Sequence, residues 1–125
     1  MRLQTNRKYV ALILALMASV AIGVAHSAAP MAGKERVIKI VAKRFAYSPN
    51  QIVLKTGESA RLEFTALDFT HGFKIPDLGI RADLPPGKVT VVSLTPQKAG
   101  SYDFLCDNFC GSGHEEMNGR IVVKD

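Results

Sequence analysis

Apolar and polar residues alternate along several short segments of this chain, most regularly between residues 60 and 65. Ala60, Leu62 and Phe64 are apolar, and each is followed by a charged or polar residue. A period of two sends alternate side chains to opposite faces, so this segment predicts a half-buried antiparallel strand with these three side chains inward. Short runs rich in β-branched or aromatic residues predict further strands at residues 37–41, 51–55, 89–94, 102–105 and 120–124.

Turns with glycine, proline or asparagine separate the predicted strands. The segment 77–88 has two glycines and two prolines and predicts a longer loop. No stretch after Pro30 has a helical period. Six or seven short strands with such turns predict an all-β sandwich. A length of 125 residues leaves little room for a second domain.

The amino-terminal segment has a different pattern. An apolar run over residues 9–25 follows three basic residues. This order is typical of an export signal, and Ala25-His26-Ser27 places small residues where a signal peptidase would cut, before Ala28. An uncleaved membrane anchor is the alternative, because the run is only slightly shorter than the roughly 20 residues of a membrane span.

Residues 1–29 are therefore expected to be a helical signal peptide or membrane anchor, and residues 30–125 to form the sandwich domain. The positive-inside rule then places the domain in the periplasm, or on the outer face of the cytoplasmic membrane. The chain has a formal charge of +5, but loss of Arg2, Arg7 and Lys8 leaves 13 basic residues against 11 acidic ones. A net charge of +2 makes nucleic acid a poor partner.

The side chains with distinctive chemistry are concentrated between the last two predicted strands. Their pattern is Cys-x3-Cys-x3-His-x2-Met, formed by Cys106, Cys110, His114 and Met117. Thiolate, imidazole and thioether groups are soft ligands, and together they favour copper among the common metals. His71 follows an earlier strand, and two loops at one end of a sandwich would bring it to this segment.

Each of these residues also has a simpler interpretation. Cys106 and Cys110 would form a disulfide in an oxidising compartment, although so short a loop gains little stability and has a tight geometry. Two cysteines and two histidines would complete a tetrahedral zinc site, but Met117 would then have no role. Alone, Met117 is typical of a core. The combination of donors is what favours copper.

This loop resembles the binuclear copper (CuA) motif of cytochrome c oxidase subunit II, which also occurs in nitrous oxide reductase. The segment His-Gly-Phe-Lys-Ile-Pro-Asp-Leu-Gly-Ile, which begins at His71, resembles the upstream histidine segment of the same subunit. The similarity runs from about Val37 to Lys124. It implies the cupredoxin fold, a Greek-key β-sandwich, in agreement with the strand pattern.

The resemblance implies two copper ions as the cofactor. It assigns the metal contacts to six residues: His71, Cys106, Asn108 (through its backbone carbonyl), Cys110, His114 and Met117. Both cysteines would bridge the two ions, and each histidine would bind one of them. Met117 would contact weakly the copper opposite the one bound by the Asn108 carbonyl.

The function that the resemblance implies is single-electron transfer. The expected donor is a c-type cytochrome or a similar redox protein, and the expected acceptor is a terminal oxidase or reductase. A heme–copper oxidase catalytic subunit is a further expected partner. Three phenylalanines are expected to shield the metal, and four acids to form a docking ring for a basic partner. These residues are Phe73, Phe104 and Phe109, and Asp103, Asp107, Glu115 and Glu116.

Three features depart from the family pattern. The chain has one amino-terminal apolar segment where the mitochondrial-type subunit has a two-helix anchor, and it has no Trp. Asn108 stands where many members have a glutamate that helps to hold a magnesium ion. These differences concern assembly into an oxidase and leave the copper ligands unchanged.

Two other functions remain open at the level of sequence. A mononuclear blue-copper carrier would use His71, Cys110, His114 and Met117, and would leave Cys106 without a role. A non-redox copper-binding or delivery protein would use the same thiolates. The sequence has no serine–histidine–carboxylate arrangement, phosphate-binding loop or carboxylate pair that argues for catalysis. No autonomous catalysis is therefore expected, although the chain would accept electrons as a subunit of a cytochrome c oxidase.

Overall fold

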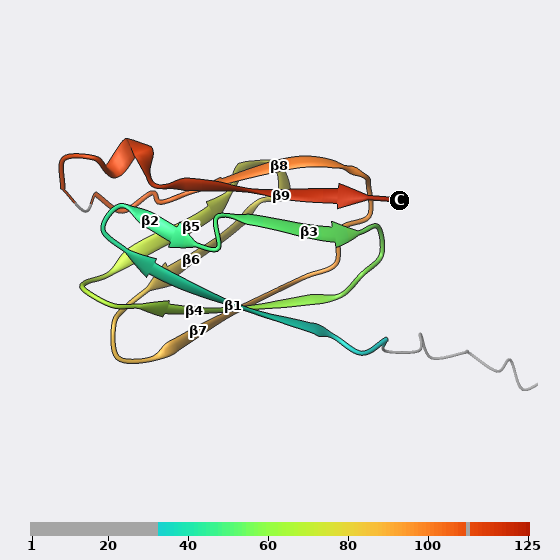
Figure 1. The fold of residues 1–125 in the computed structure, drawn as a ribbon, viewed down its shortest axis with the longest axis horizontal. Coiled ribbons are helices and arrows are strands. Elements are labelled where there is room, and N and C mark those ends of the chain that lie inside the picture. Colours follow the sequence, from blue (N-terminus) through green and yellow to red (C-terminus); the bar gives the residue numbers. More distant parts are fainter. Residues whose placement is uncertain (1–32, 110) are drawn as a thin grey trace, which may run out of the picture. The chain divides into compact units, whose positions relative to one another are not determined.

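The computed structural model describes residues 33–109 and 111–125, and this part of the chain is a β-sandwich without α-helices (Figure 1). Its strands are β1 (Arg36–Lys43), β2 (Ala46–Ser48), β3 (Gln51–Lys55), β4 (Ala60–Ala66), β5 (His71–Ile75), β6 (Ile80–Leu84), β7 (Val89–Leu94), β8 (Gly100–Leu105) and β9 (Asn118–Lys124). Two short 3-10 turns are η1 (Pro76–Leu78) and η2 (His114–Glu116). All six segments predicted as strands are confirmed.

The helix expected within residues 1–29 lies outside the described residues, as does Cys110. In the described ranges, no helix has the length and apolar character needed to cross a membrane.

The strands form two sheets, one in the order β2-β1-β4-β7 and the other in the order β3-β9-β8-β5-β6. Most neighbours are antiparallel, but β1 pairs with β4 and β3 pairs with β9 in parallel. The segment predicted as an antiparallel strand, β4, is antiparallel to β7 and parallel to β1. The alternation of apolar and polar residues cannot distinguish parallel from antiparallel pairing, because side chains alternate between faces in both.

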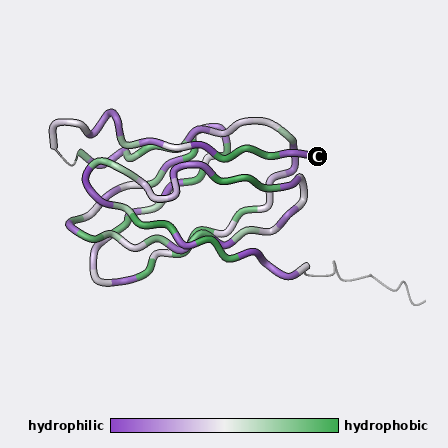
Figure 2. The backbone as a smooth tube through the Cα atoms, in the orientation of Figure 1, coloured by the Kyte–Doolittle hydropathy of each residue, from purple (hydrophilic) through white to green (hydrophobic). Residues whose placement is uncertain are grey.

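The core lies between the sheets. Ala60, Leu62 and Phe64 are fully buried, as the alternation predicts. Hydrophobic residues follow the strands and hydrophilic residues the connecting turns (Figure 2). Tyr47 packs edge-on against three core rings, the nearest being Phe104 at 5.2 Å between centroids. These aromatic contacts join both sheets into one core.

The sequence pattern missed three strands. β2 has only three residues, too few to show a period. β5 begins at His71, so this histidine lies on a strand and not in the predicted loop. β6 lies inside the segment 77–88, where a loop was predicted. Gly79 and Pro85 border β6 and do not interrupt it, and Gly79 takes the left-handed conformation that ends η1.

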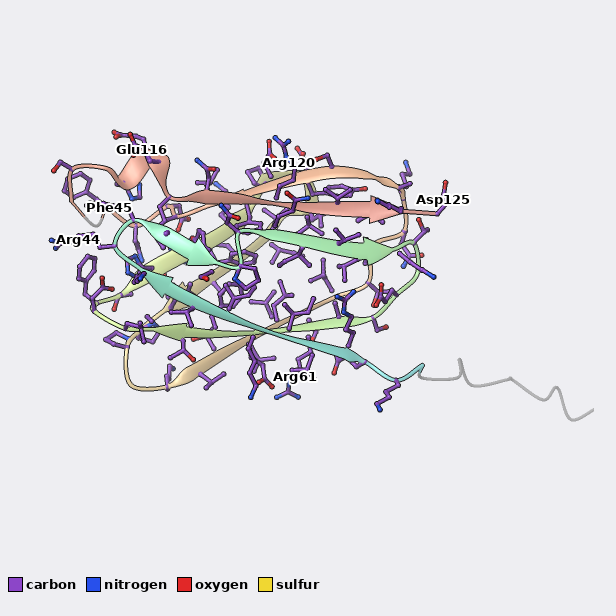
Figure 3. The ribbon with its side chains drawn as sticks, viewed as in Figure 1. Arg44, Phe45, Arg61, Glu116, Arg120 and Asp125 are labelled. Atoms are coloured by element: carbon purple, nitrogen blue, oxygen red, sulfur yellow. The ribbon has the colours of Figure 1, made fainter. Side chains whose placement is uncertain are left out.

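Several connections gather at one end of the sandwich (Figure 1). Arg44 and Phe45, between β1 and β2, lie at the same end as Glu116 (Figure 3). The Arg44 amide donates to Asp68 Oδ2 at 2.8 Å, which joins the first turn to the β4–β5 loop. A Cβ on Gly113 would approach the Phe45 ring to 2.8 Å, so the segment 106–117 also packs on this turn. Three connections therefore support one another.

Gly119 offers a test of this packing. A Cβ at this position of β9 would overlap the Phe104 ring and the Asn50 carbonyl. Gly119→Ala should lower the free energy of unfolding by about 1–3 kcal/mol, because overpacking displaces core side chains. Urea denaturation measures this change. Gly33→Ala, where no atom lies within 4 Å, is the control and should change stability by less than about 0.5 kcal/mol. Equal effects of the two substitutions would contradict the described packing.

Candidate metal centre

His71 has the surroundings of a metal-binding histidine. Its side chain is fully buried at the start of β5. The ring Nε2 lies 2.6 Å from Asp68 Oδ1, a distance at which the N–H donates to the carboxylate. In the neutral ring, this bond favours the tautomer in which Nδ1 is free to accept or to bind a metal. Nδ1 is buried and has no hydrogen-bond partner among the residues described. Metal-binding histidines combine these two features, so the ring fits a metal ligand.

Asp68 is a site residue that the sequence analysis missed. The spacing Asp-x-x-His is the signal that would have found it. Its carboxylate also accepts the amides of Arg44 and Phe69, at 2.8 and 2.9 Å. Partial burial raises the pKa of Asp68, but the hydrogen bonds from Arg44, His71 and Phe69 outweigh it and lower the pKa to about 2. The carboxylate is therefore charged at neutral pH and fixes the imidazole ring.

Cys106 lies next to His71 in space. It follows β8 directly, and only 2% of its surface is exposed. The Gly72 amide donates to Sγ at 3.3 Å, and the thiol lies 3.3 Å from the carbonyl oxygen of Asn108. The Asn108 side-chain amide in turn donates to the His71 carbonyl at 3.4 Å. Three of the predicted metal contacts are thus neighbours, although β5 and the segment 106–117 are far apart in sequence.

Met117 and His114 lie at the other end of this segment. Met117 is buried, and its carbonyl accepts the Cys106 amide at 3.1 Å, so the two ends of the loop meet. His114 begins η2, and its carbonyl accepts the Met117 amide at 3.1 Å. The imidazole of His114 is partly exposed, and its centroid lies 5.9 Å from that of Phe109.

The donors in this region have the chemistry that copper prefers: imidazole, thiol and thioether. Cys110 is the sixth predicted contact and lies outside the described residues. Within residues 33–109 and 111–125, no three His, Cys, Asp or Glu side chains are arranged as a metal site. The convergence of all six contacts on one point therefore stays a prediction.

Two of the four acids predicted to form a docking ring are paired with arginines, and the ring itself stays a prediction. Asp103 pairs with Arg120, and Asp107 with Arg81, each at 2.6 Å. The hydrogen bond from Arg120 lowers the pKa of Asp103. Arginines thus neutralise two of the four carboxylates, whereas the other two, on η2, are exposed.

Two of the three phenylalanines predicted to shield the metal are buried, and the third is exposed. Phe73 and Phe104 are fully buried core residues. Phe109 is 82% exposed, because it lies in the loop and points away from the core. The 82% exposure of Phe109 is measured without a metal, so its shielding role stays a prediction.

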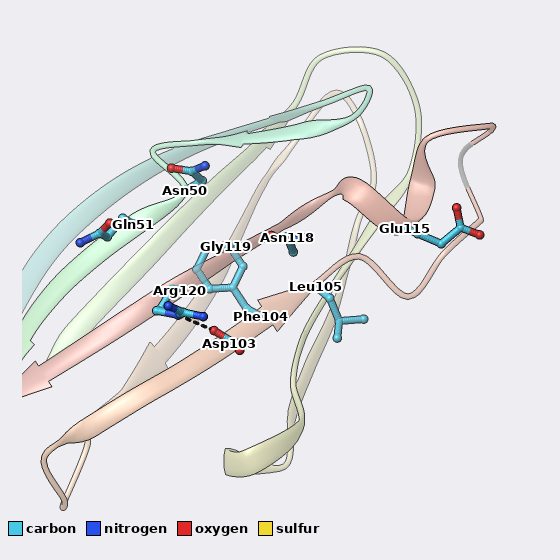
Figure 4. Close-up of a pocket in the computed structure, with 9 residues that line it drawn as sticks. All are labelled: Asn50, Gln51, Asp103, Phe104, Leu105, Glu115, Asn118, Gly119 and Arg120. Atoms are coloured by element: carbon cyan, nitrogen blue, oxygen red, sulfur yellow. Dashed lines mark hydrogen bonds and ion pairs between the residues drawn. The ribbon is translucent and has the colours of Figure 1, made fainter.

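A groove of about 500 Å³ runs along β8 and β9 (Figure 4). Its lining is mainly polar and includes the Asp103–Arg120 ion pair, with Glu115 at the end near the loop. None of the five predicted metal contacts that the structure describes lines this groove.

The sequence matches a known family and known proteins. The family described as "Cupredoxin-like domain" matches residues 11–123. Cytochrome c oxidase subunit 2 of Thermus thermophilus is 35% identical over 88 residues, which are 70% of this chain and 65% of that protein. The chain thus spans slightly less than two thirds of that relative.

Two solved structures share the fold. The periplasmic domain of subunit II of cytochrome oxidase from Bradyrhizobium japonicum has a TM-score of 0.65 at 22% identity, covering 72% of this chain and 85% of that one. A copper binding protein, solved by NMR in the apo form, has a TM-score of 0.60 at 30% identity, covering 74% and 90%. Both likenesses confirm the β-sandwich predicted from the strand pattern.

The bond between Asp68 and His71 can be tested in the metal-free protein. Asp68→Ala should lower the free energy of unfolding by about 1–3 kcal/mol, because it leaves the buried Nε2 of His71 without a partner. Asp68→Asn should cost less, since an amide oxygen still accepts the ring N–H. Urea denaturation measures both. Asp103→Ala removes an exposed ion pair and should cost less than about 1 kcal/mol. If Asp68→Ala cost no more than this control, the buried bond would not stabilise the protein.

Proposed function

Because the chain belongs to the cupredoxin-like domain family, we propose that it transfers single electrons through a binuclear copper centre of the CuA type. One observation carries the proposal. His71 is buried, with Nδ1 unpartnered among the described residues and Nε2 held by Asp68, and the next residue, Gly72, donates its amide to the sulfur of buried Cys106. The proposed contacts are His71, Cys106, the carbonyl of Asn108, Cys110, His114 and Met117.

The proposed ligands would hold two copper ions, which would supply single-electron transfer with little change in the metal–ligand bonds. The protein's part is to keep the ligands in place. Asp68 holds the His71 ring in one orientation and one tautomer. The Gly72 amide holds the Cys106 sulfur in position by a hydrogen bond. A hydrogen bond to a ligating sulfur also tunes the reduction potential of the metal.

Burial completes the arrangement. His71, Cys106 and Met117 are each at most 2% exposed. Phe73, two residues after His71 on β5, adds core packing on this strand. Little water therefore reaches these donors, which limits solvent rearrangement during electron transfer. His114 is partly exposed, in contrast to these three buried ligands.

The proposed donor is a c-type cytochrome or a similar redox protein, and the proposed acceptor is a terminal oxidase or reductase. The similarity to an oxidase subunit 2 supports a heme–copper oxidase catalytic subunit as a partner. We place the domain in the periplasm or on the outer face of the cytoplasmic membrane. The basic, apolar and small-residue order of residues 1–29 supports export.

Copper delivery is the second candidate function. The 30% identity with a solved copper binding protein favours it. This function would use the same donors but would hold labile Cu(I), without a stable coloured Cu(II) form. A mononuclear blue-copper site would leave Cys106 unused, although Cys106 is buried and its sulfur accepts the Gly72 amide.

Copper stoichiometry and the EPR spectrum of residues 28–125 distinguish these functions. We expect two coppers per chain and one unpaired electron with hyperfine coupling to both nuclei. Cys106→Ser should abolish the two-nucleus spectrum, because one bridging thiolate is lost. Far-UV circular dichroism of the metal-free variant confirms that it folds.

The other outcomes assign the other functions. One copper per chain, with coupling to one nucleus and little effect of Cys106→Ser, would replace the binuclear centre by a blue-copper site. Tightly bound Cu(I) with no stable Cu(II) signal would favour delivery.

A further inference from the structure

Arg81 contacts the candidate copper loop from a neighbouring strand. It lies in β6, and its Nε is 2.6 Å from Oδ2 of Asp107, the residue that follows Cys106. Its Nη2 is 2.8 Å from Asp83 Oδ1. The guanidinium group thus bridges a carboxylate of its own strand and one in the loop, and its planar set of donors suits two such partners.

Asp107 is turned inward although it carries a charge. Only 20% of its side chain is exposed, and Oδ1 is buried without a hydrogen-bond partner among the described residues. A buried carboxylate oxygen without a partner is unfavourable, and a loop residue is otherwise free to turn to water. The contact with Arg81 is the described interaction that offsets this cost.

The inward carboxylate occupies a place beside the metal ligands. A Cβ on Gly72 would overlap Asp107 Oδ1, so the carboxylate lies directly on the Gly72 backbone. The amide of the same glycine donates to Cys106 Sγ. Asp107 therefore covers the backbone that holds this cysteine, which agrees with the 2% exposure of Cys106.

Asn108 is linked to Arg81 through Asp83. Its side-chain amide donates to Asp83 Oδ1 and to the His71 carbonyl, each at 3.4 Å. Asp83 is also bound by Arg81. Arg81 thereby acts on both residues that follow Cys106, directly on Asp107 and through Asp83 on Asn108.

We propose that Arg81 is a positioning residue of the copper loop, which draws Asp107 against Gly72 and so covers Cys106 and fixes the backbone of Asn108. This role rests on the proposed function for its effect on copper, but the arrangement belongs to the metal-free protein. It also assigns Asp107 to the support of the loop and not to partner docking.

The first test measures alkylation of Cys106 by iodoacetamide in the metal-free, reduced protein, with residue-resolved peptide mapping. Arg81→Gln should raise the rate about three- to fivefold, the scale on which loss of such an ion pair shifts a local opening equilibrium. Arg81→Lys keeps a positive charge near Asp107 and should restore most of the protection.

Arg120→Gln is the matched control. Arg120 also pairs with an aspartate, Asp103, at 2.6 Å, but this pair joins β8 to β9 in the groove and does not contact Gly72 (Figure 4). The control should leave the alkylation rate of Cys106 unchanged. Equal rates for Arg81→Gln and Arg120→Gln, or no rescue by Arg81→Lys, would overturn the proposal.

A second measurement separates this proposal from the function on which it rests. In the copper-loaded protein, Arg81→Gln should shift the reduction potential and the EPR hyperfine coupling, whereas Arg120→Gln should not. If the unchanged chain gave no two-nucleus spectrum, the binuclear function would fail while the alkylation result still decided the role of Arg81. If the spectrum were present but the two variants behaved alike, the role of Arg81 would fail alone.

Discussion

The hydrogen bond between Asp68 and His71 is the interaction on which the candidate centre depends. It directs one ring nitrogen to a carboxylate and leaves the other without a partner in the described structure. The carboxylate is itself held by the amides of Arg44 and Phe69. A buried histidine is thus oriented by backbone groups from two separate connections. Such an arrangement is rigid before any ligand arrives, which reduces the ordering that binding requires.

The aromatic core supports the strand that carries His71. The Tyr47 hydroxyl donates to the Gly72 carbonyl at 2.5 Å, and the Tyr47 ring packs against Phe64, Phe73 and Phe104. The strand that carries His71 is therefore attached to the aromatic centre of the sandwich. Displacement of β5 would disturb packing contacts across both sheets. The packing of the whole domain therefore fixes the position of His71.

The sequence predicts most of the fold but only part of the site. The alternation of Ala60, Leu62 and Phe64 identifies a strand because burial on one face imposes a period of two. β5 was missed because it contains Gly72, and β6 because Gly79 and Pro85 border it. Ligand types are visible from spacing alone, since copper selects soft donors. The roles of Asp68 and Arg81 are not, because each depends on contacts between connections distant in sequence.

Gly72 contacts both Cys106 and Asp107. Its amide bonds the Cys106 sulfur, and its missing side chain leaves room for the carboxylate of Asp107. Positions 72 and 107 are therefore coupled through space across 35 residues of chain. Among relatives, a side chain at position 72 should occur only with a small residue at position 107, or with a loop that leaves the strand by another path. Covariation of positions 72 and 107 among relatives would then indicate this contact, which neither position indicates by itself.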